Sequence, residues 1–294
     1  MAESYQFIFI FLLILTTAVE FYLGHRQKNF VLRNKKKVPT AFTKIIKLAD
    51  HQKAADYTVS KINFNSIDLV FGAIILYLLT LGGGINLMNN LMGQFFENPL
   101  LNGALIITSL FVALHLISLP SSIYQTFVIE TKYGFNKITP KLFFMDQMKS
   151  VIIMIILSAV VSFAALWILS ALGNEWWLWL WIFLSILSLI AIALAPVLKQ
   201  LFNKYTPIKD KNLKKNIEKL LKRCGFESSG LFEMNGSLRS THGNAFFGGF
   251  GKTKRIIFFD TLLEKLDTKE IEAVIAHELG HFKRNHVKKL LVIQ

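Results

Sequence analysis

Two histidines and a glutamate near the carboxyl-terminal end of the sequence have the types and spacing found in metal-dependent hydrolases. They form the pattern HELGH, in which His277 and His281 stand four residues apart and Glu278 follows the first histidine. On a helix, four residues advance the chain by about 400°, so both imidazoles lie on one face, one turn apart. Such a pair can hold one Zn²⁺ ion, and Glu278 is placed to accept a proton from a zinc-bound water but is poorly aimed to be a ligand.

The residues before the motif predict the helix that these side chains require. Asp267 followed three residues later by Glu270 is a capping-box pattern, and good helix formers come next, so we expect a helix that begins near Thr268. The alternative is an ordinary helix with surface histidines and a solvated glutamate. At this chain's own frequencies of His and Glu, the HExxH pattern should arise by accident in fewer than about 1% of such chains, which favours the metal site.

A catalytic zinc needs a third protein ligand, and the motif alone does not supply it. Val287 occupies the position at which a longer histidine pattern would place its third histidine, and His286 lies about 140° around the helix from His281. No acidic residue follows His281. We therefore expect that either an upstream carboxylate or a ligand beyond Gln294 completes the site.

The rest of the sequence is typical of a membrane protein. The 294 residues are 53% apolar and include 26 phenylalanines, and five apolar runs are long enough to cross a bilayer. These runs occupy residues 7–23, 67–88, 100–119, 151–172 and 176–198. Three glycines at 82–84 predict a helix break or a close-packing point within the second run.

The distribution of positive charge predicts the orientation of the spans. Of the 33 Lys and Arg residues, ten lie at 25–64, four at 121–150 and nineteen after residue 198. Five crossings place these segments on one side of the bilayer, and the positive-inside rule makes that side the cytoplasm, with the amino terminus outside or in a lumen. Nucleic-acid binding is not expected from the net charge of +14, because the basic residues are not interleaved with stacking aromatics on one surface.

From Lys199 onward the sequence has the character of a soluble domain. Residues 211–223 predict an amphipathic helix, and residues 230–234 and 255–260 predict strands. The segment 248–251 predicts a tight turn. Its GKT does not predict a phosphate loop, because no glycine precedes Gly251 by five residues and a strand follows.

The predicted fold class is therefore mainly α: a polytopic helical membrane protein with a cytoplasmic α+β domain. We expect a five-span membrane region at residues 1–198, with cytoplasmic loops at 25–66 and 121–150. The zinc-protease domain is expected at 199–294 and ends at the start of a sixth span.

Several stretches together resemble the type I CAAX prenyl proteases, which are integral-membrane zinc metalloendopeptidases. The resemblance rests on LPSSIYQTFVIETKYGFNKITPKLFFMDQ (119–147), LFNKYTPI (201–208), GSLRSTHGNAFFGGFGKTKRIIFFDTLL (236–263) and AVIAHELGHFKRNH (273–286). It covers almost the whole chain and is specific, because it joins a general metal motif to particular loops in the right order.

This resemblance implies seven helices around a chamber in the membrane, with the zinc site at its cytoplasmic end. It implies that His277 and His281 are zinc ligands and that Glu278 is the general base. The third ligand of the family is a glutamate well downstream of HExxH. We therefore expect the sequence to be truncated and this glutamate to lie beyond Gln294.

The resemblance also implies a substrate-binding strand. Asn244, Ala245 and Phe246 are expected to form an exposed strand edge on which the peptide lies extended, because main-chain hydrogen bonds of an added strand align it.

The predicted function is that of a zinc metalloendopeptidase that cleaves near the carboxyl terminus of CAAX-type prenylated or other membrane-associated proteins. Its expected partners are a peptide or protein substrate and the lipid bilayer, in the inner membrane of a bacterium or the endoplasmic reticulum of a eukaryote. Two alternatives remain open. One is a quality-control protease for membrane proteins, and the other is a catalytically inert membrane scaffold that lacks the third ligand.

Overall fold

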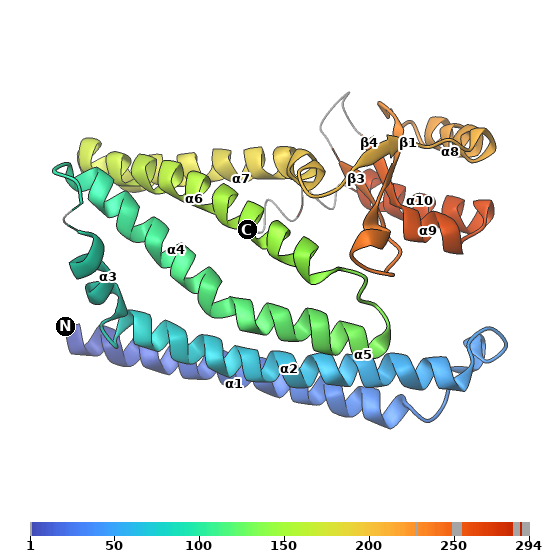
Figure 1. Cartoon of the computed structure of the whole chain (residues 1–294), viewed down its shortest axis with the longest axis horizontal. Helices are drawn as coiled ribbons and strands as arrows, with labels where there is room; N and C mark the ends of the chain where they lie inside the picture. Colours follow the sequence, from blue (N-terminus) through green and yellow to red (C-terminus); the bar gives the residue numbers. More distant parts are fainter. Residues whose placement is uncertain (1, 94, 227, 249–254, 285–288, 290–294) are drawn as a thin grey trace. The chain divides into compact units, whose positions relative to one another are not determined.

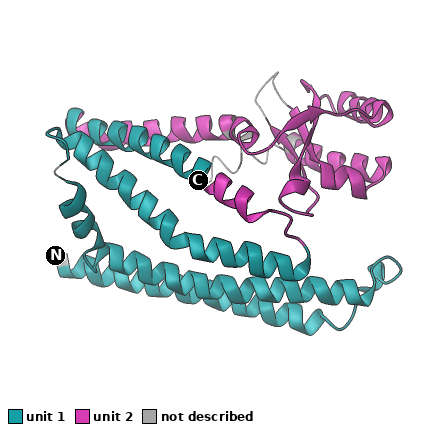
Figure 2. Cartoon of the chain, in the orientation of Figure 1, with its two compact units in different colours: residues 1–134, 148–171 teal, residues 135–147, 172–294 magenta. Residues whose placement is uncertain are grey.

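The chain forms two compact units. The computed structural model describes residues 2–93, 95–226, 228–248, 255–284 and 289 (Figure 1). Unit 1 comprises residues 1–134 and 148–171, and unit 2 comprises residues 135–147 and 172–294 (Figure 2). This division differs from the hydropathy boundary at 198/199, because the last apolar helix and the first turns of the one before it group with the mixed α/β region.

Unit 1 is built from long apolar helices joined by short connections. They are α1 (Ala2–Asn34), α2 (Leu48–Thr80), the short α3 (Gly84–Met92), α4 (Pro99–Tyr124), a π-helical segment (Gln125–Glu130), α5 (Thr131–Tyr133) and most of α6 (Pro140–Ala171). The N-cap Asn98 starts α4 by accepting hydrogen bonds from the backbone N–H groups of Leu100 and Leu101, and Pro99 holds the first helical position.

Five helices of the described chain are long and apolar enough to span a membrane: α1, α2, α4 with its extension, α6, and α7 (Trp176–Gln200) of unit 2. In their most apolar stretches at most 11% of the residues are buried. Apolar side chains therefore point outward, as is required where lipid replaces water as the solvent. The prediction of a mainly helical fold with five candidate spans and a small mixed region is confirmed.

The helices extend beyond the apolar runs, so the expected loops at 25–66 and 121–150 are mostly helical. Helix α1 continues to Asn34 and α2 begins at Leu48. Contacts between polar side chains support these extensions: Lys35 Nζ lies 2.6 Å from Asp56 Oδ1, and the Tyr57 hydroxyl donates to Glu130 Oε1 at 2.6 Å. The helices thus continue beyond the point at which the sequence stops being apolar.

The second span ends earlier than its apolar run. Helix α2 stops at Thr80, and α3 begins at Gly84 after Gly83, whose φ of +83° places it in the left-handed region. A glycine adopts this conformation without a Cβ clash. The predicted helix break at 82–84 is therefore confirmed, and the predicted continuation of one span to residue 88 is wrong.

Unit 2 is a small sheet packed against helices. After α7 the elements are β1 (Tyr205–Pro207), α8 (Lys211–Arg223), β2 (Leu231–Met234), β3 (Ala245–Gly248), β4 (Arg255–Phe259), α9 (Asp260–Lys265) and α10 (Thr268–Lys283). The strand order is β1-β2-β4-β3, with β2 and β4 parallel and the two outer pairs antiparallel. The two predicted strands are confirmed as β2 and β4. The predicted turn at 248–251 lies largely outside the described residues, since only Gly248 is described and it ends β3.

One hydrophobic core lies between the sheet, α8 and α10. The predicted amphipathic helix is confirmed as α8: its cap Asp210 accepts hydrogen bonds from Asn212 N and Leu213 N, and its apolar face is buried. The buried members of the core are Leu213, Ile217, Leu221, Phe226, Leu231, Ala245, Ile256, Phe258, Leu262, Ile271, Ile275 and Leu279. Helix α10 and strand β3 are thus fixed against the same interior.

Candidate active site

The helix that carries the histidines begins where the sequence predicts. The Asp267 backbone N–H donates to Glu270 Oε2, and the Glu270 backbone N–H donates to Asp267 Oδ1, both at 2.9 Å. This reciprocal pair is a capping box, and it satisfies two backbone donors at the start of α10. The start of the helix is therefore fixed by side chains within four residues of one another.

One face of α10 packs in the core, and another carries the two histidines. Ile271, Ile275 and Leu279 follow one another at intervals of four residues and are 3%, 0% and 4% exposed in the core. His277 and His281 are exposed, and Glu278 is half-buried. Burial of the apolar stripe thus orients the histidine face away from the core.

The two imidazoles lie close enough to share one metal ion. His277 Nε2 and His281 Nε2 are 3.1 Å apart, and the ring centroids are separated by 4.9 Å. Two zinc–nitrogen bonds of about 2.05 Å at a tetrahedral angle require a nitrogen separation of about 3.3 Å. The pair therefore fits a zinc site in both donor type and spacing.

The described residues offer two candidate ligands for such a site. Within them, no group of three or more His, Cys, Asp or Glu side chains is close enough to hold a metal ion. A catalytic zinc takes three protein ligands and leaves a fourth position open. A third ligand for the pair is therefore not found among the described residues.

Strand β3 lies at one end of the described sheet and contains two of the three residues expected to bind substrate. Ala245 is buried and Phe246 is half-buried, while Asn244 is exposed just before the strand. The Asn244 carbonyl accepts a hydrogen bond from Phe259 N at 2.9 Å, which begins the pairing of β3 with β4. Lys199 Nζ, from the last turn of α7, lies 3.9 Å from the centroid of the Phe246 ring, within the range of a cation–π contact.

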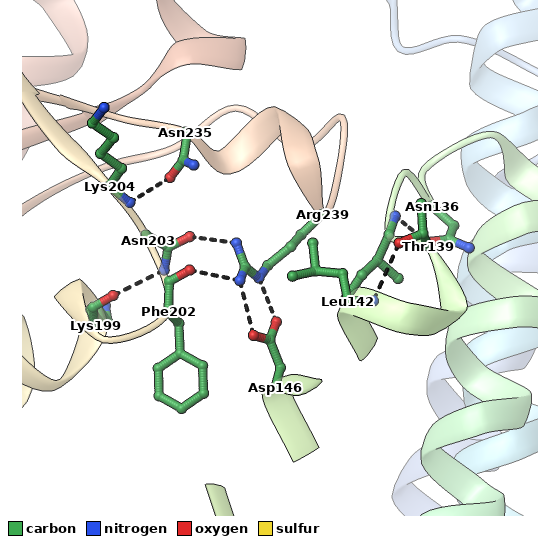
Figure 3. A network of polar contacts seen from close by, with 11 residues as sticks. Asn136, Thr139, Leu142, Asp146, Lys199, Phe202, Asn203, Lys204, Asn235 and Arg239 are labelled. Carbon is green, nitrogen blue, oxygen red and sulfur yellow. Dashed lines mark hydrogen bonds and ion pairs between the residues drawn. The ribbon is translucent and has the colours of Figure 1, made fainter. Parts of the chain in front are cut away.

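A charged side chain in the connection from β2 to β3 joins three segments of unit 2. Arg239 forms a bidentate ion pair with Asp146, from Nε to Oδ2 at 2.8 Å and from Nη2 to Oδ1 at 3.1 Å (Figure 3). Its Nη1 also donates to Asn203 Oδ1 at 3.1 Å, and Nη2 donates to the Phe202 carbonyl at 2.6 Å. We call Arg239, Asp146, Phe202 and Asn203 the Arg239 cluster.

The same connection is also paired along its backbone with the segment before α6. Lys137 N donates to the Arg239 carbonyl at 3.1 Å, and Thr241 N donates to the Phe135 carbonyl at 3.0 Å. The rings of Phe135 and His242 stack with centroids 4.3 Å apart. Residues that precede β3 are therefore held by side-chain and main-chain contacts together.

The Arg239 cluster is not predictable from local patterns in the sequence. Arg239 and Asp146 are separated by 93 residues, so no local spacing connects them. The only signal in the sequence is that both lie in polar segments that carry the family resemblance. That signal points to the segments and not to a contact between the two side chains.

Family models match almost the entire chain. Residues 27–204 match the model described as "CAAX prenyl protease N-terminal, five membrane helices", and residues 207–294 match the model of peptidase family M48. The chain belongs to the CAAX prenyl protease 1 family. It is accordingly a multi-pass membrane protein of the M48 peptidases, as the resemblance predicts.

Relatives of the CAAX prenyl protease 1 family match over different lengths. The chain is 38% identical to CAAX prenyl protease 1 of Saccharomyces cerevisiae over 60% of its own length and 40% of that protein. It is 31% identical to the homolog of Dictyostelium discoideum over 99% of its own length and 70% of that protein. A crystal structure of S. mikatae Ste24p superposes with a TM-score of 0.88 at 30% identity, covering 96% of this chain and 67% of that one.

Proposed function

We propose that the protein is a zinc metalloendopeptidase that cleaves near the carboxyl terminus of prenylated CAAX-type proteins. The observation that carries this proposal is the 3.1 Å separation of His277 Nε2 and His281 Nε2 on a capped helix, in a chain that belongs to the M48 peptidases. The substrate class follows from the names of the relatives, which are CAAX prenyl proteases.

Each residue of the HExxH motif has its own part in the proposed reaction. His277 and His281 hold the ion through Nε2, and a downstream glutamate completes the ligand set. Zinc, when bound, supplies Lewis acidity that polarises a peptide carbonyl and acidifies water. The Glu278 carboxylate accepts the proton released during attack and delivers it to the leaving amine.

Strand β3 is proposed to align the peptide. An extended substrate adds to the edge of β3 that pairs with no strand of the described sheet, so that main-chain hydrogen bonds set its register with little dependence on side chains. Strand β3 and α10 share one core, so a peptide on this edge is held beside the helix that carries the histidines.

The proposed orientation places this chemistry at the cytoplasmic side of the membrane, with the amino terminus outside or in a lumen. All 33 basic residues lie in segments that five crossings bring to one side. Protease digestion of right-side-out and inverted vesicles tests this arrangement. Cleavage within residues 199–294 in the right-side-out vesicles would contradict it.

The proposed function is tested by peptide cleavage and metal content measured on the same sample. The protein, including the downstream glutamate that the resemblance implies, is placed in lipid nanodiscs with zinc and a prenylated CAAX peptide. We expect cleavage near the peptide's carboxyl terminus, and we expect Glu278→Gln to reduce turnover by at least about a thousandfold while zinc content is kept. Glu272→Gln, a matched change elsewhere on α10, serves as the control.

Three outcomes would contradict parts of this proposal. Full turnover in Glu278→Gln would exclude Glu278 as the base. Equal cleavage of prenylated and unprenylated peptides would favour the quality-control alternative. Zinc binding without cleavage in the parent protein would leave the metal site standing and refute catalysis by this chain.

A further inference from the structure

The Arg239 cluster has a geometry that lysine could not reproduce. The guanidinium group uses Nε and Nη2 for the two oxygens of Asp146 and also binds Asn203 and the Phe202 carbonyl, so it contacts three acceptor groups at once (Figure 3). A planar fork of five donors can do this, whereas an ammonium group is a point charge. The side chains of Arg239 and Asp146 are only 21% and 15% exposed, so water screens this pair less than an ordinary surface pair.

The two side chains that accept hydrogen bonds from Arg239, those of Asp146 and Asn203, lie at the ends of long helices. Asp146 lies in the second turn of α6. Asn203 follows α7 and closes its last turn, because its backbone N–H and its side-chain amide both donate to the Lys199 carbonyl, at 3.0 and 3.1 Å. The acceptors are therefore carried by regular structure, and Arg239 comes from an irregular connection that binds to them.

The connection that Arg239 fixes leads directly into β3. Ala245, the first residue of the strand, is six residues downstream. On the way, the His242 carbonyl accepts a hydrogen bond from the Thr261 hydroxyl at 2.8 Å, and the Thr241 carbonyl accepts one from Lys265 Nζ. The start of β3 is thus held by α9 on one side and by the Arg239 cluster with residues 135–137 on the other.

We propose that Arg239 is a positioning residue for the substrate edge: its contacts with Asp146 and Asn203 set where β3 starts and so align the peptide beside α10. This inference rests on the proposed function, because that proposal makes β3 the substrate edge. Arg239 is proposed neither as a zinc ligand nor as a residue that contacts the scissile bond. It acts through the five residues, 240–244, that separate it from the strand.

Hydrogen exchange of the full chain in nanodiscs tests the structural half of the inference. Arg239→Met removes the charge and the fork while keeping an unbranched side chain. We expect exchange of the backbone amides at 240–248 to increase by at least about tenfold, while exchange in α8 stays unchanged. Arg239→Lys keeps the charge but not the planar fork, so it should restore only part of the protection.

Peptide binding tests the functional half. In the Glu278→Gln background, which separates binding from turnover, Arg239→Met should raise the Kd of a prenylated CAAX peptide by about tenfold. In the otherwise unmodified protein, KM should rise by a similar factor while kcat changes less than about twofold, and zinc content should not change. Lys214→Met is the matched control, since it breaks the exposed Lys214–Glu218 pair on α8.

The outcomes separate this inference from the proposed function. A uniform rise in exchange over unit 2, or no rise at 240–248 in Arg239→Met, would overturn the positioning role. A rise in amide exchange confined to 240–248, with Kd and KM unchanged, would also overturn the positioning role, because β3 would then be mobile without effect on peptide binding. If the parent protein neither binds nor cleaves the peptide, the proposed function fails, and with it the substrate part of this inference.

Discussion

Helix α10 and strand β3 pack against one core, yet contacts of very different range determine where each of them begins. The capping box of α10 joins Asp267 to Glu270, three residues away. The start of β3 depends on Arg239, whose partner Asp146 is 93 residues away in the chain. The start of the helix that carries HExxH is thus specified within a short segment, while the strand beside it depends on the rest of the unit.

The largest expected effect concerns the metal site, which the local interactions of α10 create. His277→Ala removes one of the two proposed ligands, so we expect zinc affinity to fall by at least about a thousandfold. Zinc titration with metal analysis of the purified protein measures this. His51→Ala, in unit 1, should leave affinity unchanged; if His277→Ala also retains stoichiometric zinc, the assigned ligand pair is wrong.

The next largest effect tests whether α10 and β3 really depend on one core. Ile275 is 0% exposed, and Ile275→Ala should lower the free energy of opening of α10 by about 3 kcal/mol, because a cavity replaces the buried side chain. Amide exchange in α10 should rise about a hundredfold, with a smaller rise in β3. Glu272→Ala is the control on the same helix. A rise confined to α10 would show that the strand does not rely on the shared core.

A smaller effect is expected from breaking the capping box at the start of α10. Asp267→Ala should cost about 1 kcal/mol, because the backbone N–H of Glu270 loses its acceptor. Exchange in the first turn of α10 should rise about fivefold, and β3 and zinc binding should be unaffected. Asp267→Ser, which keeps a capping oxygen, should behave like the parent. Increased amide exchange in β3 would show that the start of α10 and the start of β3 do not form independently.

The smallest effect lies at the opposite edge of the sheet. Burial raises the pKa of the Tyr205 phenol in β1 above its ordinary value of 10. The unfolded chain therefore loses this proton at a lower pH than the folded protein, and stability present below about pH 10 falls as the pH rises further. Unfolding midpoints measured from pH 8 upward should fall more steeply for the parent than for Tyr205→Phe. Parallel curves would show that Tyr205 does not contribute.

The same contrast of range explains what could be predicted from the sequence. The capping box, the HExxH spacing and the apolar face of α8 are local patterns, and all three are found as expected. The ends of the spans were less predictable, because hydropathy reports the lipid-facing part of a helix and not its polar continuation, as the start of α2 at Leu48, far before its apolar run, shows.

Two features of the candidate site could not be obtained from local patterns. Strand β3 was expected only through the family resemblance, since AFFG is short and lacks a clear alternation of polar and apolar residues. The contact of Arg239 with Asp146 depends on how α6 and the β2–β3 connection meet, which neither residue's neighbours in sequence reveal.

The parallel pairing of β2 with β4 constrains the order in which this protein can be assembled during translation. Leu231 pairs with Ile256, so the middle of the sheet cannot close until the ribosome has released the later strand. By then Asp146 and Asn203 have long left the exit tunnel, and the newly made Arg239 meets acceptors that are already in place. Until β4 emerges from the tunnel, the nascent chain should therefore expose the apolar faces of α8 and β2, and it would be a target for chaperones during that interval.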